Sequence, residues 1–419
     1  MDMKLRLTIM NFLQFAVWGA YLTSMGTYLA SHGHAENIGH FFSTQGIVSI
    51  FMPALIGIIA DRWIQAQKVY GICHLICAAA MITLGVYGLD GNSMSVIYPL
   101  YFLAIAFYMP SLSMSYAVSY NAMAQNGMDT IREFPAIRTF GTIGFIASMW
   151  IVDLMGYQTS SMQFVVSGVL GLMLGLYAFT LPKCDIKGAD SHASIGDKLG
   201  LKAFRLFSIP RMAVFFIFSA LLGVALQITN GYANTFISSF GNISDFADTF
   251  GVRHANILIS ISQISETLCI LLIPFFLGRF GIKKVMIIAM LAWVLRFALF
   301  GLGNPGGGVW LFVLSCVVYG VAFDFFNISG TLFVNQETSP EIRSSAQGLF
   351  MMMNNGIGCT LGMLAAQMVV NHYVNSETDP MAVWQGWQTS WYIFAGYALV
   401  LAVAFALIFK YKHNPGQRP

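Results

Sequence analysis

The feature that most constrains this chain is a series of long apolar segments, each near the length that crosses a bilayer as a helix. One crossing takes about 20 predominantly apolar residues. Hydrophobic residues make up 57% of the 419 positions and charged residues 9%, whereas a soluble domain carries about 25% charged residues. We therefore predict an all-α, multi-pass membrane protein with twelve spans, at about residues 7–30, 37–60, 67–88, 95–120, 136–156, 161–181, 210–236, 254–277, 284–303, 309–334, 345–372 and 389–410.

Positive charges fall almost entirely on one side of these predicted spans. If the N-terminus is cytoplasmic, 19 of the 21 Lys and Arg residues lie in inside segments, Arg253 lies outside and Arg296 lies within a span. Cytoplasmic loops of membrane proteins are enriched in Lys and Arg. We therefore expect both termini to be cytoplasmic. The sequence does not decide whether Arg296 pairs with an acid or extends to the membrane surface.

The longest inside loop, residues 182–209, divides the chain into residues 1–181 and 210–419, with six predicted spans on each side. The second part of the loop mixes apolar and basic residues, which predicts a short amphipathic helix on the inner membrane surface. We expect the loop to act as a linker between two six-helix halves.

The two halves share a short motif at equivalent places. The sequence PAIR at 135–138 follows the fourth predicted span, and PEIR at 340–343 follows the tenth, so Arg138 and Arg343 begin equivalent helices. Many secondary transporters are built from duplicated halves and bind substrate at the repeat interface near the middle of the membrane. The pattern favours a transporter.

Two acidic residues, Glu266 and Asp324, lie deep within predicted spans. An ionisable side chain at the bilayer centre costs about 3 kcal/mol on insertion scales, so such a residue usually faces a cavity or a partner. The spacing around Asp324 places Tyr319, Phe323 and Asn327 on one helix face, with the acid beside it. This stretch is the first candidate for a functional site.

Other predicted spans carry polar faces at helical spacing, formed by Arg138, Thr142 and Phe145, by Gln227 and Asn230, and by Gln263 with Glu266. Amides, carboxylates and hydroxyls can hydrogen-bond to a polar solute, and aromatic rings can stack on a flat ring. The structural alternatives are also open. The amides can join helices, at about 0.6 kcal/mol each, the phenylalanines can be packing residues, and Arg138 can be a structural arginine.

Residues 57–68, GIIADRWIQAQK, resemble the cytoplasmic loop signature of the major facilitator superfamily, in which Asp-Arg follows a glycine at a fixed spacing. The later part of that signature usually also contains a glycine and a second basic residue, and both are absent here. The resemblance implies that Asp61 and Arg62 form a conformational latch with helix ends.

Nearly the whole chain is similar to the bacterial nucleoside:proton symporters of this superfamily, the family of the nucleoside and xanthosine permeases. The strings that carry the similarity are FLQF at 12–15, WG at 18–19, MPALIGIIAD at 52–61, FPAIRTFGTIGF at 134–145, GVALQITN at 223–230, SISQISET at 260–267, AWVLRFALF at 292–300, YGVAFDFFNISG at 319–330 and IRSSAQG at 342–348.

The resemblance implies import of nucleosides such as uridine with protons, by alternating access across the bacterial inner membrane. It also implies a monomer with no cofactor and no nucleic-acid partner. The family's substrate site maps onto Arg138, Thr142, Phe145, Gln227, Asn230, Gln263, Glu266, Tyr319, Phe323 and Asp324. Glu266 and Asp324 are the proton-coupling candidates, and their roles are not apportioned.

Functions of other classes make different demands. A proton-coupled sugar transporter would keep the carboxylates but would not require the aromatic residues. A channel would need a pore-lining ring or filter. A membrane enzyme would need a nucleophile or a metal site, and the sequence has no phosphate-binding glycine motif, no His pair at metal-ligand spacing and no serine elbow. We read Cys73, His74 and Cys77, which share a helical spacing, as packing residues rather than as metal ligands.

Overall fold

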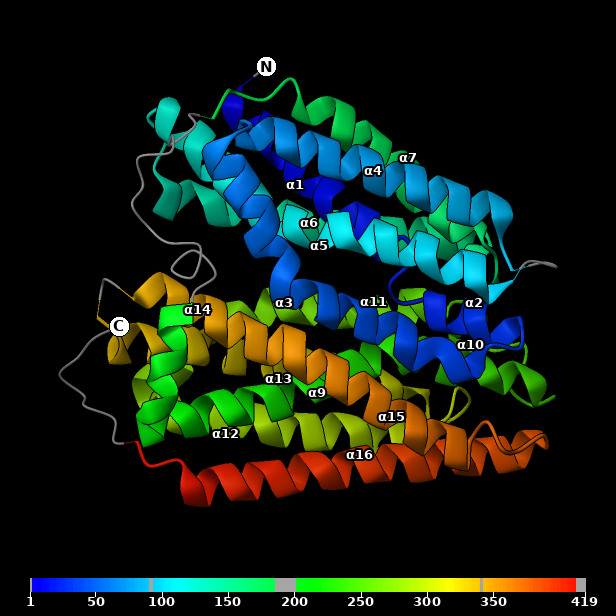
Figure 1. The fold of residues 1–419 in the computed structure, drawn as a ribbon. Coiled ribbons are helices and arrows are strands. Elements are labelled where there is room, and N and C mark those ends of the chain that lie inside the picture. The colour runs from blue at the N-terminus through cyan, green and yellow to red at the C-terminus, as the bar shows by residue number, and fades with distance from the viewer. Residues whose placement is uncertain (1, 90–92, 185–200, 340–341, 412–419) are drawn as a thin grey trace. The chain divides into compact units, whose positions relative to one another are not determined.

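The computed structural model describes residues 2–89, 93–184, 201–339 and 342–411, and within these ranges the chain forms helices and turns without a strand (Figure 1). The side chains of Asp61, Arg62, Ile131, Leu201, Lys202 and Ser344 are also outside the description. The side chains of the proposed latch, Asp61 and Arg62, and residues 197–200 at the start of the expected amphipathic helix therefore lie outside the described residues. Of that helix, Leu201–Ser208 is described as a 3-10 helix, η3.

The chain divides into two compact units. The first comprises Met1–Ala35 and Ile47–Lys198, and the second comprises Glu36–Gly46 and Leu199–Pro419. The helices that begin in the first part of the chain are α1 (Met3–Gly19), α2 (Met25–Ser31), α3 (Ile38–Arg62), α4 (Ala66–Tyr87), α5 (Met94–Gln125), α6 (Thr130–Leu154) and α7 (Met162–Ala178), with 3-10 turns η1 (Ala35–Asn37) and η2 (Tyr157–Thr159).

The later helices all belong to the second unit. They are α9 (Pro210–Ser239), α10 (Phe250–Arg253), α11 (Ala255–Cys269), α12 (Ile273–Leu302), α13 (Val309–Glu337), α14 (Arg343–Met351), the π-helix η6 (Met352–Gly358), α15 (Cys359–Tyr373) and α16 (Pro380–Ile408), with 3-10 turns η4 (Phe240–Asn242) and η5 (Ile270–Leu272). In this unit α12 lies against both α13 and α16 (Figure 1).

Nine helices among the described residues are long and apolar enough to cross a membrane. They are Ala35–Ala60, Ala66–Tyr87, Met94–Gln125, Arg132–Leu154, Pro210–Asn242, Ala255–Leu302, Val309–Glu337, Ser345–Tyr373 and Pro380–Ile408. The chain is therefore a multi-pass membrane protein. The expected spans at 210–236 and 309–334 coincide closely with α9 and α13, because both helices are apolar along nearly their whole length.

Two expected spans differ in detail from the helices observed. The first is divided into α1 and α2 by the turn at residues 20–24, although the N–H groups of Leu22 and Met25 still bond to carbonyls four residues earlier, at 3.0 and 2.8 Å. The ninth is not separated from the eighth by a loop, because α12 runs from Ile273 to Leu302 and the two expected spans meet at a kink at Gly281, whose φ of 75° favours glycine.

A buried hydrogen-bond cluster centred on Gln14 joins α1 to α4 and α5 in the first unit. The Gln14 Oε1 atom accepts from the Tyr70 hydroxyl at 2.6 Å and lies 2.9 Å from His74 Nε2, and Gln14 Nε2 donates to Ser111 Oγ at 3.0 Å. Buried polar side chains of this kind are stable when they are bonded to one another. His74 thus serves a polar helix contact, and the expected packing role holds for Cys73 and Cys77, which are fully buried.

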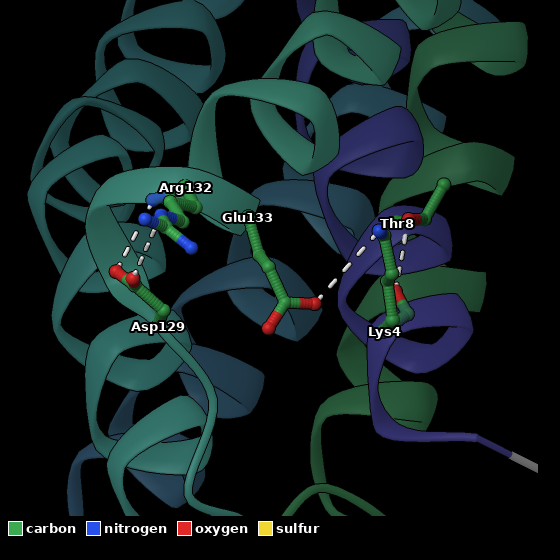
Figure 2. Close-up of polar contacts among 5 residues, drawn as sticks. All are labelled: Lys4, Thr8, Asp129, Arg132 and Glu133. Carbon is green, nitrogen blue, oxygen red and sulfur yellow. Dashed lines mark hydrogen bonds and ion pairs between the residues drawn. The ribbon is translucent and has the colours of Figure 1, made fainter.

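An ion pair at the surface of the first unit also joins α1 to α6. Lys4 Nζ lies 3.8 Å from Glu133 Oε2, and Figure 2 shows the two side chains reaching across between their helices. At the start of α6, next to Glu133, the backbone N–H of Arg132 donates to Asp129 Oδ1 at 3.2 Å. This bond satisfies one of the free donors in the first turn of the helix. Exposed ion pairs contribute about 0–1 kcal/mol each, so this contact orients the helix ends more than it stabilises them.

Glycines set the closest helix contacts in both units, as is common where helices pack in a membrane. A Cβ added to Gly144 on α6 would lie 2.1 Å from the Phe12 carbonyl oxygen on α1. In the second unit, a Cβ on Gly223 of α9 would lie 2.0 Å from the carbonyl oxygen of Asn354 in η6. Only glycine permits these approaches, because the neighbouring atom belongs to the backbone and cannot turn aside.

We expect Gly144→Ala to separate α1 from α6, because its new methyl group would overlap the Phe12 carbonyl. Overpacking of this kind costs about 1–3 kcal/mol. The measurement is the melting temperature of the purified protein in detergent, which should fall by several degrees. Gly396→Ala on α16 is the matched control, since a Cβ there meets no atom within 4 Å. Equal melting temperatures for the two variants would contradict the account of this contact.

Candidate functional site

The aromatic residues expected near Asp324 lie together on α13 in the second unit. Tyr319 and Phe323 stack with ring centroids 5.6 Å apart and an angle of 5° between their planes. Residues four apart on a helix are neighbours on one face, which is why the two rings meet. Tyr319 is buried and Phe323 is half-buried, so the pair presents one enclosed ring and one accessible ring.

The two acidic residues also lie close to this pair. Asp324 on α13 is 5% exposed, and Glu266 on α11 is half-buried. The helices α11 and α13 meet closely here, because a Cβ added to Gly320 would lie 2.6 Å from the Ser265 carbonyl oxygen, so Glu266 and Tyr319 each adjoin this contact in the chain. The structure thus places the two acids near one tyrosine, as their common location in the later part of the chain suggested.

The amides expected at the site lie on α9 and α11 of the same unit. Asn230 Nδ2 donates to Gln227 Oε1 at 3.3 Å, so these two side chains form one polar face on α9. Gln263 on α11 is buried, and within the described residues its Oε1 atom accepts no hydrogen bond. A buried amide oxygen usually has a partner, so Gln263 offers an acceptor to a bound molecule.

The remaining three expected residues lie on α6 in the first unit. The Arg138 guanidinium lies 3.8 Å from the Phe15 ring centroid, and Arg138 Nε donates to the Tyr116 hydroxyl at 3.0 Å. Phe145 is buried and packs edge-on against Trp18, with centroids 6.3 Å apart. Thr142 is half-buried and lies one helical turn from Arg138.

The sequence left open whether Arg296 pairs with an acid or extends to the membrane surface, and the structure shows neither arrangement among the described residues. Arg296 is 2% exposed, and the ion pairs found among the described residues do not include it. One of its terminal nitrogens, Nη1, donates to the Ser315 carbonyl at 2.7 Å, and its guanidinium carbon lies 4.6 Å from the Tyr319 ring centroid. A carbonyl and an aromatic face therefore replace the acid that we considered.

The structure adds residues, such as Trp293 and Asn354, that the sequence analysis did not select. A small, partly open pocket, whose volume of about 210 Å³ includes open solvent, is lined by Leu222, Leu226, Trp293, Ala322, Phe323, Phe326, Asn327 and Asn354. Asn354 Nδ2 donates to Asn327 Oδ1 at 2.9 Å, and Asn327 Nδ2 donates to the Phe323 carbonyl at 3.1 Å. The adjacent asparagines at 354 and 355, in an otherwise apolar span, were the available signal.

Asn354 belongs to the π-helix η6, an element that is rare and often found at functional sites. The close approach of α9 at Gly223 places η6 beside the polar face of α9. In the second unit, α9, α11, α12, α13 and η6 thus bring together two carboxyl groups, several amides and a stacked aromatic pair. Such a set can bind a polar molecule that has a flat ring, and it can exchange a proton.

Comparison with known proteins gives consistent results over the whole chain. The family model described as Nucleoside H+ symporter matches residues 1–414. The chain is 49% identical over 417 residues to nucleoside permease NupG of Escherichia coli (strain K12), with 99% of this chain and 97% of that protein covered. It is 45% identical to the xanthosine permease of the same organism, with 99% and 98% covered.

A solved structure is also similar. The crystal structure of nucleoside transporter NupG matches with a TM-score of 0.89 and 48% identity, covering 98% of this chain and 100% of that chain. These findings confirm the family resemblance found in the sequence.

We expect Asn354→Ala to destabilise the second unit, because it removes the hydrogen bond to Asn327 in a buried position. Loss of a buried partner costs about 1–3 kcal/mol. The readout is the thermal melting of the purified protein. Asn355→Ala is the matched control, since among the described residues the Asn355 amide bonds only to the sulfur of Met351, at 3.5 Å, which is a weak acceptor. A control variant that melts as low as Asn354→Ala would refute the assignment.

Proposed function

Because this chain belongs to the nucleoside H+ symporter family, we propose that it imports nucleosides together with protons. It is a transporter rather than an enzyme, as its permease relatives are. The observation that carries the proposal is the placement of a buried acid, Asp324, beside the stacked rings of Tyr319 and Phe323. The rings suit the flat base of a nucleoside, and the acid suits a proton or a ribose hydroxyl.

The substrate contacts follow from this arrangement and from the family resemblance. Phe323, the more accessible ring of the pair, packs on the base, and Tyr319 supports it from behind. The amides of Gln227, Asn230 and Gln263 bind the ribose hydroxyls and the edge of the base. The proposal assigns the remaining contacts to Arg138, Thr142, Phe145, Glu266 and Asp324.

Glu266 and Asp324 are the proposed proton carriers. A carboxyl group that takes up a proton while the site opens outward, and loses it while the site opens inward, couples proton entry to uptake. The nucleoside must also bind the two states of the protein unequally during the cycle, because a ligand with equal affinity for both would shift nothing. The two carboxyl groups can divide proton transfer and hydroxyl binding between them.

The finer architecture belongs to the same proposal. We propose twelve spans of the major facilitator fold, in six-helix halves of residues 1–181 and 210–419 with a linker at 182–209. Ala255–Leu302 is 48 residues long, enough for two crossings on either side of the Gly281 kink. The helix pair α1–α2 and the 17-residue apolar helix Met162–Ala178 supply two more.

We further propose that the protein resides as a monomer in the bacterial inner membrane with both termini in the cytoplasm. The distribution of Lys and Arg supports this orientation. By resemblance to the loop signature, Asp61 and Arg62 act as the conformational latch.

Transport in proteoliposomes tests the proposed function. We expect vesicles containing the purified protein to accumulate radiolabelled uridine when the outside is made acidic, and not to accumulate sucrose. Accumulation should stop when a protonophore removes the gradient. Sucrose uptake in place of uridine uptake would favour the sugar transporter, and a chemically altered uridine inside the vesicles would favour an enzyme.

The same assay separates coupling from binding. We expect Asp324→Asn and Glu266→Gln each to abolish gradient-driven accumulation of uridine, because an amide cannot carry a proton. Asp245→Asn and Glu377→Gln are the matched controls, since both acids are exposed outside the spans. Full concentrative uptake by both site variants would contradict the assignment of the proton carriers.

A further inference from the structure

Arg296 is a buried cation for which the proposed transport cycle has no role. It lies in the last third of α12, within an apolar span, and is 2% exposed. A charge in this position costs several kcal/mol unless the surrounding groups compensate it. An apolar residue would fill the space without that cost, so the contacts of the guanidinium should show what the charge does.

The first set of contacts joins α12 to α13. Arg296 Nη1 donates to the Ser315 carbonyl at 2.7 Å and lies 3.4 Å from the hydroxyl of Ser262 on α11. In return, Ser315 Oγ donates to the Arg296 carbonyl at 2.9 Å. Because the two residues bond to each other in both directions, the register between α12 and α13 is set at this level.

The second set of contacts concerns Tyr319, one helical turn beyond Ser315. The guanidinium carbon of Arg296 lies 4.6 Å from the Tyr319 ring centroid, well within the range of a cation–π interaction. Trp293, three residues before Arg296 on α12, meets the same ring edge-on at 5.9 Å and 87°. Two residues on one face of α12 thus hold the plane of Tyr319.

Tyr319 in turn determines where Phe323 can lie. The two rings are nearly parallel, at 5°, so rotation of Tyr319 would remove the surface on which Phe323 stacks. Phe323 lines the pocket, and Arg296 does not. The guanidinium therefore influences the pocket indirectly, and its contact with the Tyr319 ring is the shortest route from it to Phe323.

We propose that Arg296 is a positioning residue, which holds Tyr319 in the orientation that stacks on Phe323 and thereby sets the affinity for the base of the nucleoside. This inference rests on the proposed function. It assigns to Arg296 no contact with the substrate.

A double-mutant cycle tests this role, with the dissociation constant for uridine measured by calorimetry on the full-length protein in detergent. We expect Arg296→Met to weaken uridine binding about tenfold, in line with a buried cation–π contact. Tyr319→Leu should weaken it at least as much. Since Arg296 acts through Tyr319, the double variant should bind no more weakly than Tyr319→Leu alone.

Phe300 provides the control partner for the cycle. Its ring lies 5.3 Å from the same guanidinium carbon, but its ring contacts are with Phe236, Phe312 and Trp391. In the cycle that pairs Arg296→Met with Phe300→Leu, the effects on uridine binding should be independent. Arg296→Lys keeps a cation over the tyrosine and should bind within about threefold of the unaltered protein.

The outcomes are distinguishable. If the unaltered protein does not bind uridine, the proposed function fails, and this inference fails with it. If it binds uridine but the effects of Arg296→Met and Tyr319→Leu add, or Arg296→Lys binds as weakly as Arg296→Met, the positioning role alone is overturned. Should Arg296→Met not fold, Arg296→Gln runs the same cycle, because it removes the charge and retains a donor for the Ser315 carbonyl.

Discussion

The second unit depends on the burial of opposite charges among apolar helices. Asp324 and Arg296 both lie inside spans where an ionisable side chain is costly, and neither forms an ion pair with the other among the described residues. The arginine is compensated by serine groups and aromatic faces, whereas the acid lies beside the proposed binding surface. Tyr319 is under the electrostatic influence of both. Arg296 therefore serves the structure, whereas Asp324 is the acid to which we assign a role in transport.

The helix contacts that hold this arrangement are unusually close. Gly223 lets α9 approach η6 so nearly that a single added carbon would overlap the Asn354 carbonyl. That approach brings the asparagine of a π-helix to Asn327 at one end of the α13 face, while Arg296 holds Ser315 at the other end. Tyr319 and Phe323 lie between these two fixed points. A rigid aromatic surface of this kind suits the proposed binding of a flat base, because its side chains would lose little freedom on binding.

Much of this could be predicted from the sequence. The length of the apolar segments predicted the positions of α9 and α13, and helical spacing predicted that Tyr319 and Phe323 share one face. The kink at Gly281 falls in the connection expected between the spans at 254–277 and 284–303, whereas the π-helix was missed because it does not alter the apolar pattern that marks a span. The partner of Arg296 was missed for a different reason. Arg296 contacts a backbone carbonyl and a ring on another helix. Contacts of that kind depend on how two helices pack, which the sequence pattern does not specify.

The central claim is that the stacked pair on α13 receives the base of a nucleoside while Asp324 lies within reach of the same molecule. An experimental structure of the protein with bound uridine tests it most directly. The account predicts the uracil ring packed against Phe323, with a carboxyl oxygen of Asp324 or Glu266 near the ribose or the base. Uridine bound away from α13, with the Tyr319 and Phe323 rings still stacked and untouched, would contradict it.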